Sequence, residues 1–229
     1  MKTLVGCALY EGSSEFLHDY CLMLERNRKH AEFDCFFSAN YAVPDHFGCK
    51  KNHTILEKYN MPYYPTLFSP EHSSSRERIA ISYATIETHF LGYDYDYLIF
   101  VESDVRFDDH GVAILIEKLG KYPVILGFHP YDFYTTSEFD EKTGIVQRYW
   151  FAPEMIDKEG NDFKVAASGW QCFGRRREVV ERFRPRWWYE NRNHSDAFWY
   201  HDYKGPVMVT KEVPYLHLRK PWRTKPVKL

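Results

Sequence analysis

The sequence predicts an α/β domain in which helices cover a mostly parallel central sheet. Strand-like and helix-like segments alternate from residue 3 to about residue 128, which is the pattern of parallel strands joined by crossover helices. The run YLIFVE, residues 97–102, is apolar at odd and even positions before its final glutamate, as expected of a strand buried on both faces. With 229 residues, of which 44% are hydrophobic, the chain can bury a full core, and its length favours one domain over two.

The first half begins with a predicted strand at residues 3–10 and a helix at residues 12–26. The helix sequence, GSSEFLHDYCLMLER, starts with serines suited to capping and then places apolar side chains at helical spacing. Residues 33–39, FDCFFSA, predict a second strand. Residues 40–70 are rich in Pro, Tyr and His and predict an irregular connection with one short helix near residues 53–59.

A longer helix is predicted to lead into the central strand. Ser74 and Glu77 match a capping box, and Gly92 is a suitable residue to follow the last turn. Beyond the central strand, Asp108 or Asp109 can cap a further helix. The expected helices and strands of this part are residues 74–92, 97–102, 108–120 and 123–128.

The pattern changes after this point. Residues 131–163 are polar, aromatic and interrupted by turn-forming residues, which predicts hairpins or a flap inserted into the domain. Regular structure is expected to resume in four segments: a strand at 165–174, a helix at 177–183, a helix at 194–205 and a strand at 207–213.

Charge and cysteine content indicate the class of protein. The net charge of −2 argues against a nucleic-acid binder, which is usually basic. The five cysteines are scattered without a C-x-x-C pair, which predicts a reducing compartment. The N-terminus reads as a strand and not as a signal peptide, and no apolar window has the length of a membrane span. We therefore expect a cytoplasmic location.

Two acidic residues, Glu102 and Asp104, follow the central strand with Ser103 between them. Open parallel sheets bind ligands outside the carboxyl ends of their strands, so these acids are expected to face a crevice. Two carboxylates this close repel each other, and a nearby cation would keep both ionised. Carboxylate oxygens suit Mg²⁺ and Mn²⁺, which leave coordination positions open for phosphate oxygens. The alternative is that both acids are solvated or that Asp104 opens a turn.

Three stretches together resemble the GT-A glycosyltransferases, in particular the small single-domain enzymes close to family 2. They are RERIAISYATIETHFLGYDYDYLIFVESD (residues 76–104), SGWQCFGRRREVV (168–180) and HSDAFWYHDYKG (194–205). The first stretch is similar to the family's Arg-containing helix, which leads through a strand to an Asp-x-Asp motif. The second is similar to its Gly-containing strand and the basic start of the next helix. The third is similar to the helix that carries its catalytic carboxylate. Two departures are that Glu102 stands where the family most often has Asp, and that SANYA, residues 38–42, lacks the Asp commonly placed against the nucleotide base.

The resemblance implies a donor site built on this metal motif. Asp104 is expected to bind the metal, with Glu102 on the metal, the ribose or a metal-bound water, and His217 as a further ligand or a phosphate contact. The residues assigned to the nucleotide are Tyr10, Glu11, Arg78, Glu102 and Ser103. Plainer alternatives stay open: Tyr10 in the core, Arg78 in solvent, and His217 as a hydrogen-bonded surface residue.

On the acceptor side, the resemblance implies an aromatic surface and a base. Trp170, beside Gly169, and Trp150 in the flap would offer ring faces to a sugar. Asp196 would take the proton of the acceptor hydroxyl in an inverting transfer. Its alternative role, shared with Ser195, is to cap the helix that follows.

The predicted function is thus a metal-dependent glycosyltransferase that uses Mn²⁺ or Mg²⁺ to move a sugar from a nucleotide-sugar donor to a carbohydrate or glycoconjugate acceptor. One rival is a sugar-nucleotide pyrophosphorylase-like nucleotidyltransferase, which should carry a Gly-rich loop that LYEGSSEF, residues 9–16, lacks. The other is a non-catalytic carbohydrate-binding or scaffold module.

The expected organisation is one domain at residues 1–218 followed by a basic tail at residues 219–229. The domain divides into a nucleotide-binding half, residues 1–128, and an acceptor half, residues 129–218. The tail carries cations and no acid, which is compatible with four roles: binding the diphosphate, folding over the donor, a peripheral contact with an acidic membrane surface, or a solvated end.

Overall fold

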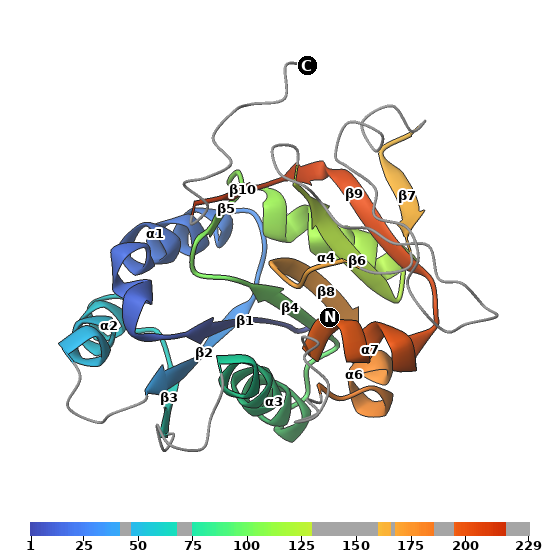
Figure 1. Cartoon of the computed structure of the whole chain (residues 1–229). Coiled ribbons are helices and arrows are strands. Elements are labelled where there is room, and N and C mark those ends of the chain that lie inside the picture. Colours follow the sequence, from blue (N-terminus) through green and yellow to red (C-terminus); the bar gives the residue numbers. More distant parts are fainter. Residues whose placement is uncertain (42–46, 68–74, 130–159, 166–167, 186–194, 219–229) are drawn as a thin grey trace.

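An eight-stranded sheet runs through the centre of the molecule, in the order β3-β2-β1-β4-β8-β6-β9-β7 (Figure 1). The computed structural model describes residues 1–41, 47–67, 75–129, 160–165, 168–185 and 195–218. The strands of this sheet are β1 (Thr3–Leu9), β2 (Asp34–Tyr41), β3 (Tyr63–Leu67), β4 (Tyr97–Val101), β6 (Val124–Phe128), β7 (Asp162–Val165), β8 (Cys172–Arg176) and β9 (Val207–Pro214). The helices are η1 (Glu11–Glu15), α1 (Leu17–Asn27), α2 (Phe47–Lys58), α3 (Ser75–Gly92), α4 (Gly111–Lys121), α6 (Arg177–Arg182) and α7 (Ser195–Tyr203).

Most of the sheet is parallel, which confirms the predicted α/β class. The pairs β3–β2, β2–β1, β1–β4 and β6–β9 are parallel. Strand β8 is inserted between β4 and β6 and is antiparallel to both, and β7 is antiparallel to β9. These two reversed strands were not predicted, because a local pattern of apolar residues indicates a strand but not its direction in the sheet.

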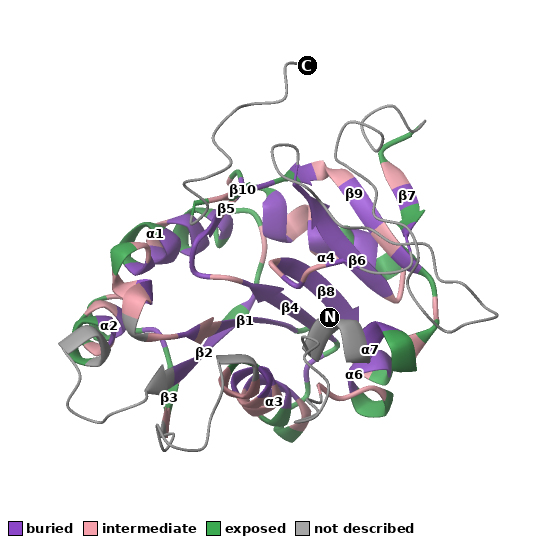
Figure 2. Ribbon diagram, viewed as in Figure 1, coloured by how far each residue is buried: buried purple, intermediate pink, exposed green. Residues whose placement is uncertain are grey.

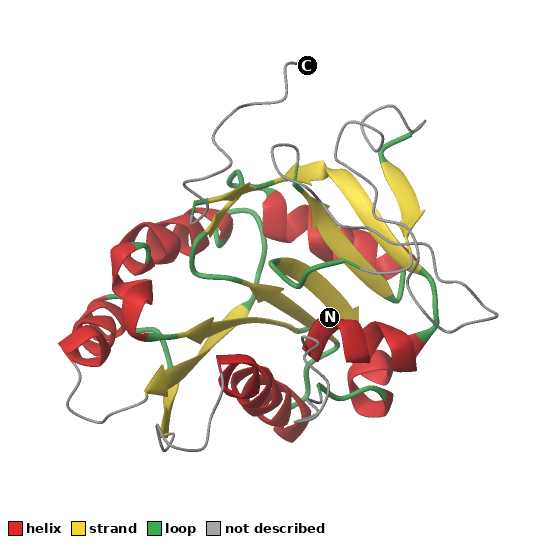
Figure 3. Cartoon of the chain, viewed as in Figure 1, coloured by secondary structure: helices red, strands yellow, loops and turns green. Residues whose placement is uncertain are grey.

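Helices cover both faces of the sheet, as Figure 3 shows, with α1 and α4 on one side and α3, α6 and α7 on the other. All residues of β4 and β6 are buried, and Figure 2 shows this burial running through the middle of the sheet. This burial on both faces explains the continuous apolar run at residues 97–101. Within the described part of the chain, no helix combines the length and the hydrophobicity needed to cross a bilayer.

The segment at residues 40–70 was predicted incorrectly as mostly irregular. The helix near residues 53–59 is longer than expected, at Phe47–Lys58, and β3 at Tyr63–Leu67 was missed. Strand β3 contains Pro65, which pairs in register with Ala39 at the edge of the sheet. Proline is tolerated at a sheet edge because only one side of the strand needs backbone donors, and its presence obscured the strand pattern.

Two other details differ from the expectation. The amide of Val112 in α4 donates to Asn27 Oδ1 of α1 at 2.9 Å, so a distant asparagine caps this helix where Asp108 or Asp109 was predicted. The predicted strand at residues 165–174 is two strands, β7 ending at Val165 and β8 beginning at Cys172. Almost all of the predicted flap, including Trp150, lies outside the described residues, and the division into two halves stays a prediction.

A second, two-stranded sheet lies beyond the end of β4 (Figure 1). Its strands are β5 (Val105–Arg106) and β10 (Leu216–His217), which pair antiparallel with His217 opposite Val105. This small sheet brings the last described strand of the chain against the residues that follow β4.

Candidate metal and donor site

The link between β4 and β5 holds both predicted metal acids in a fixed turn. The backbone amide of Glu102 donates to the carbonyl of Gln171 at 2.9 Å, and the amide of Val105 donates to the carbonyl of Glu102 at 3.0 Å. The carbonyl of Asp104 accepts from the amide of Leu218 at 2.9 Å. Backbone bonds therefore tie Glu102 to the residue before β8 and Asp104 to the residue after β10.

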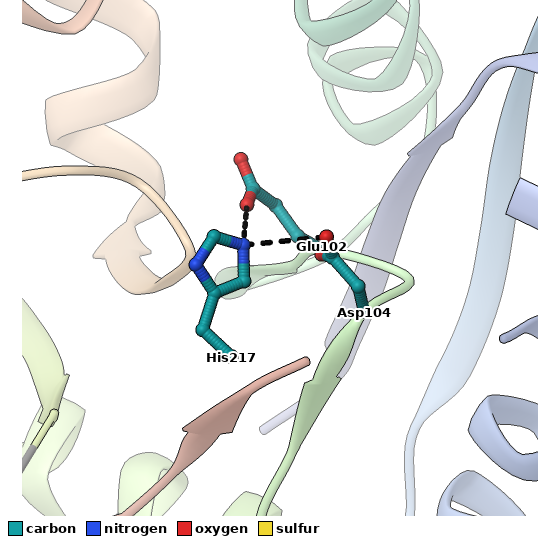
Figure 4. Close-up of side chains that lie close together, drawn as sticks. All are labelled: Glu102, Asp104 and His217. Atoms are coloured by element: carbon teal, nitrogen blue, oxygen red, sulfur yellow. Dashed lines mark ion pairs between the residues drawn. The ribbon is translucent and has the colours of Figure 1, made fainter. Parts of the chain in front are cut away.

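His217 reaches the two acids from the far end of the chain. The amide of Tyr215 donates to the carbonyl of Phe128 at 2.8 Å, so β10 is anchored to β6 just before the histidine. His217 Nε2 lies 3.3 Å from Asp104 Oδ2 and 3.5 Å from Glu102 Oε2, and Figure 4 shows the ring pointing toward both carboxylates. The structure thus brings together the three residues that were predicted to bind a metal.

The three side chains differ in their exposure. Asp104 and His217 are nearly buried, with 9% and 11% of their side chains exposed, whereas 35% of Glu102 is exposed. Burial alone would lower the pKa of His217, but hydrogen bonds and attraction from Asp104 and Glu102 raise it to about 9. A cation was expected beside the two acids to keep both ionised. In the metal-free protein, the imidazolium of His217 is that cation.

A divalent ion fits this set of ligands. The two carboxylates and the imidazole each offer one atom, and these atoms lie within 4.8 Å of one another. Ligands about 2.1 Å from an ion and at right angles are about 3 Å apart, which is close to the 3.3 and 3.5 Å that separate His217 Nε2 from the carboxylate oxygens of Asp104 and Glu102. An ion would take the place of the proton that now links His217 to the acids.

Side chains around the acids hold them in place. Tyr83 of α3 donates from its hydroxyl to Glu102 Oε1 at 3.4 Å, which leaves Oε2 toward His217. Tyr215 donates to Gln171 Oε1 at 3.4 Å, and the ring of His129 lies 6.2 Å from that of His217. The sequence analysis placed none of these three at the site. Only the contacts of the folded chain bring α3, the end of β6 and the segment after β9 together here.

Ser103 has a different role from the one predicted. Its side chain is buried and donates to Ser13 Oγ at 3.2 Å. Ser13 Oγ also accepts from the amide of Tyr10 at 3.1 Å. The hydroxyl of Ser103 therefore supports the loop after β1, and because it is buried against that loop it is not presented to a donor.

The other predicted nucleotide residues lie near the same edge of the sheet or on α3. Tyr10 follows β1 directly and is partly buried, and its carbonyl accepts from Asn52 Nδ2 at 2.9 Å. Arg78 lies in the first turn of α3 and is partly exposed. The side chain of Glu11 lies outside the described residues. Contacts of these three with a nucleotide stay predictions.

Trp170 is not available as an open face for a sugar. Only 2% of the residue is exposed, and its ring stacks on Phe173 with centroids 5.2 Å apart. The prediction failed because a tryptophan next to a glycine suits a sugar platform and a packed core equally well. At Gly169 an added Cβ would lie 2.4 Å from the carboxamide of Gln171, so the glycine allows Gln171 to lie across the backbone beside Glu102.

Asp196 is the second residue of α7, and its side chain lies outside the described residues. The helix itself is anchored by Trp199, whose ring is fully buried and whose Nε1 donates to the carbonyl of Phe183 at 2.8 Å. The backbone near Asp196 thus belongs to a helix held against the core.

Comparison with solved structures decides the fold. The crystal structure of S. aureus TarS residues 1–349 in complex with UDP-GlcNAc matches with a TM-score of 0.59 and 13% identity, over 97% of this chain and 62% of that one. The same TarS fragment in complex with UDP matches with a TM-score of 0.57 and 13% identity, over 94% of this chain and 59% of that one. The chain has a GT-A fold.

The GT-A assignment rests on structure alone. No protein-family model matches the sequence, and no curated protein matches it. The chain spans 59–62% of the two TarS structures, so the likeness concerns one GT-A unit and not the whole of that protein.

Proposed function

We propose that this GT-A chain is a metal-dependent glycosyltransferase, which moves a sugar from a nucleotide-sugar donor to a hydroxyl group of a carbohydrate or glycoconjugate. The observation that carries the proposal is the convergence of Glu102, Asp104 and His217 at the carboxyl end of the central strand. Such a position is where open α/β sheets bind their ligands. The complex of TarS with UDP-GlcNAc supports the choice of donor class.

In this proposal, Glu102, Asp104 and His217 hold the ion. When bound, a divalent ion supplies positive charge against the diphosphate leaving group. A set of two carboxylates and one imidazole favours Mn²⁺ over Mg²⁺, because imidazole is a better ligand for transition metals. Tyr83 orients Glu102 through its hydroxyl, and such supporting partners matter because they set the direction of a ligand's lone pairs.

Asp196 is the proposed base. It occupies the first turn of α7, where the helix dipole favours a negative charge. An inverting transfer needs a carboxylate that accepts the proton of the acceptor hydroxyl on the side of the sugar opposite the diphosphate.

The pyrophosphorylase-like rival finds less support. It requires a glycine-rich phosphate loop after the first strand, whereas the segment after β1 is the short helix η1 at Glu11–Glu15, with Gly12 as its one glycine.

A thermal-shift screen tests the proposal. The protein is heated with a panel of UDP- and GDP-sugars, including UDP-GlcNAc, in Mn²⁺ or in EDTA. A ligand at about 100 times its dissociation constant stabilises by about 2.7 kcal/mol, which corresponds to a rise in Tm of about 5–10 °C for a chain of this size. We expect such a rise for at least one donor, in Mn²⁺ only. Equal shifts in Mn²⁺ and EDTA would exclude the metal-dependent site.

Metal binding is also expected to release a proton from His217. Because the pKa of His217 is raised to about 9 in the metal-free protein, the imidazole is protonated near neutral pH and must lose that proton to become a ligand. Calorimetric Mn²⁺ titrations near pH 7 in two buffers of different ionisation enthalpy should report release of about one proton per ion. The apparent affinity should rise with pH until about pH 9 and then level off. An affinity independent of pH would argue against His217 as a ligand.

A further inference from the structure

A fully buried arginine lies at the centre of the sheet. Arg175 of β8 is 0% exposed, and its guanidinium carbon lies 5.0–5.4 Å from the centres of four aromatic rings. These rings belong to Phe100, Trp170, Phe173 and Trp199. We call Arg175 and these four residues the arginine box.

The charge of Arg175 is matched by Glu87, which is also fully buried on α3. Arg175 Nη2 donates to Glu87 Oε1 at 2.5 Å, and Arg184 Nε lies 3.0 Å from Glu87 Oε2. The Nε and Nη1 groups of Arg175 are buried without a hydrogen-bond acceptor among the described residues. Burying such a pair costs free energy that an apolar pair of similar volume would not cost, so stability alone does not account for these residues.

The arginine box connects the metal acids to α7. Tyr83, which donates to Glu102, precedes Glu87 by one turn of α3. The ring of Tyr83 lies 4.7 Å from that of Phe100 and 5.1 Å from that of Trp170. On the other side, the ring of Trp199 in α7 lies 5.8 Å from Trp170 and 5.1 Å from Phe173. One continuous set of packed rings thus runs from Glu102 to the helix that begins at Ser195.

We propose that Glu87 and Arg175 are positioning residues, which fix the start of α7, and with it Asp196, relative to the metal acids. This inference rests on the proposed function, because the catalytic role of Asp196 is part of that proposal. A planar guanidinium that stacks on several rings and donates to one carboxylate permits few arrangements of the elements around it. Apolar side chains of similar size would fill the space and leave the angle of α7 less defined.

The test is the double variant Glu87→Met/Arg175→Met, which replaces the pair with apolar side chains. A matched control, Lys118→Met/Asp162→Asn, removes another largely buried ion pair, with Lys118 Nζ 2.9 Å from Asp162 Oδ2, between α4 and β7. Each variant is measured for Tm, for amide hydrogen exchange of residues 199–203, whose amides bond to the carbonyls of the first turns of α7, for Mn²⁺ affinity and for the kcat and KM of transfer.

We expect Glu87→Met/Arg175→Met to melt within a few degrees of the wild type or above it. Its amides at residues 199–203 should exchange at least about tenfold faster, and its kcat should fall about 10- to 100-fold, the scale of a misplacement of about 1 Å. Its KM and Mn²⁺ affinity should stay within about twofold, because Glu102, Asp104 and His217 are unchanged. The control should keep wild-type exchange at residues 199–203.

Unaltered exchange of these amides, or a kcat no lower than that of the control, would overturn the positioning role. If the double variant does not fold, the same readouts on Glu87→Gln decide the question. A wild-type protein that turns over no nucleotide sugar would refute the proposed function, while the exchange measurement would still test whether the pair positions α7.

Discussion

Replacing Asp104 with asparagine is expected to lower donor turnover by at least about 100-fold, equivalent to about 2.7 kcal/mol of transition-state stabilisation. The substitution keeps the shape of the side chain and removes one of the two carboxylates beside His217. In the wild type, His217 Nε2 lies 3.3 Å from Asp104 Oδ2 and 3.5 Å from Glu102 Oε2. The fold should persist, because the backbone bond from Leu218 to the carbonyl of Asp104 does not depend on the side chain. Steady-state kinetics, Mn²⁺ titration and thermal melting measure the three effects.

The matched control for this variant is Glu117→Gln, which also converts a carboxylate to an amide. Glu117 pairs with Lys121 on the exposed face of α4, with 62% of its side chain exposed, and exposed pairs contribute little. Turnover and Mn²⁺ affinity should therefore match the wild type. Retention of Mn²⁺-dependent turnover in Asp104→Asn would show that the acid is not a metal ligand.

The second large effect is expected from Asp196→Asn. Asparagine caps a helix about as well as aspartate, so Tm and donor affinity should stay near the wild-type values. A carboxamide cannot accept the acceptor proton, so kcat should fall by about 10²–10⁴, the usual contribution of a positioned base. The product of the wild-type enzyme should have inverted anomeric configuration.

Two results would contradict this assignment. Full activity in Asp196→Asn would leave the residue as a helix cap, whose loss costs about 0.5–2 kcal/mol when alanine replaces it. A product with retained configuration, identified by NMR, would show that the reaction does not use a base in this role.

The position of Glu102 and Asp104 at the end of a central strand could be predicted from sequence because the evidence for it is local. The buried run at residues 97–101 defines a central strand, and residues that follow such a strand lie at its carboxyl end. His217 could not be found this way. It lies more than 100 residues away in the chain, and only the family resemblance pointed to it before the β5–β10 pairing placed it beside Asp104.

The errors have equally specific causes. Trp170 was assigned to the acceptor because aromatic residues serve cores and sugar sites alike, and burial cannot be read from one residue and its neighbour. Ser103 was assigned to the donor because it lies between two acids, yet the hydroxyl bonds to Ser13, 90 residues earlier. The antiparallel pairing of β8 with β4 and β6 was missed because the apolar pattern of a strand does not indicate its direction.

Some expectations stay predictions. The tail at residues 219–229 and its membrane contact, the flap with Trp150, and the side chains of Glu11 and Asp196 lie outside the described residues.

The central claim is that Glu102, Asp104 and His217 form a metal site at which a nucleotide sugar is cleaved. Its most direct test is the release of nucleoside diphosphate from a panel of nucleotide sugars, with and without a mixture of sugar acceptors, in Mn²⁺ and in EDTA. We expect release from at least one donor that requires Mn²⁺, is lost in Asp104→Asn and is kept in Glu117→Gln. Release that is equal in Mn²⁺ and EDTA, or that persists in Asp104→Asn, would contradict the claim.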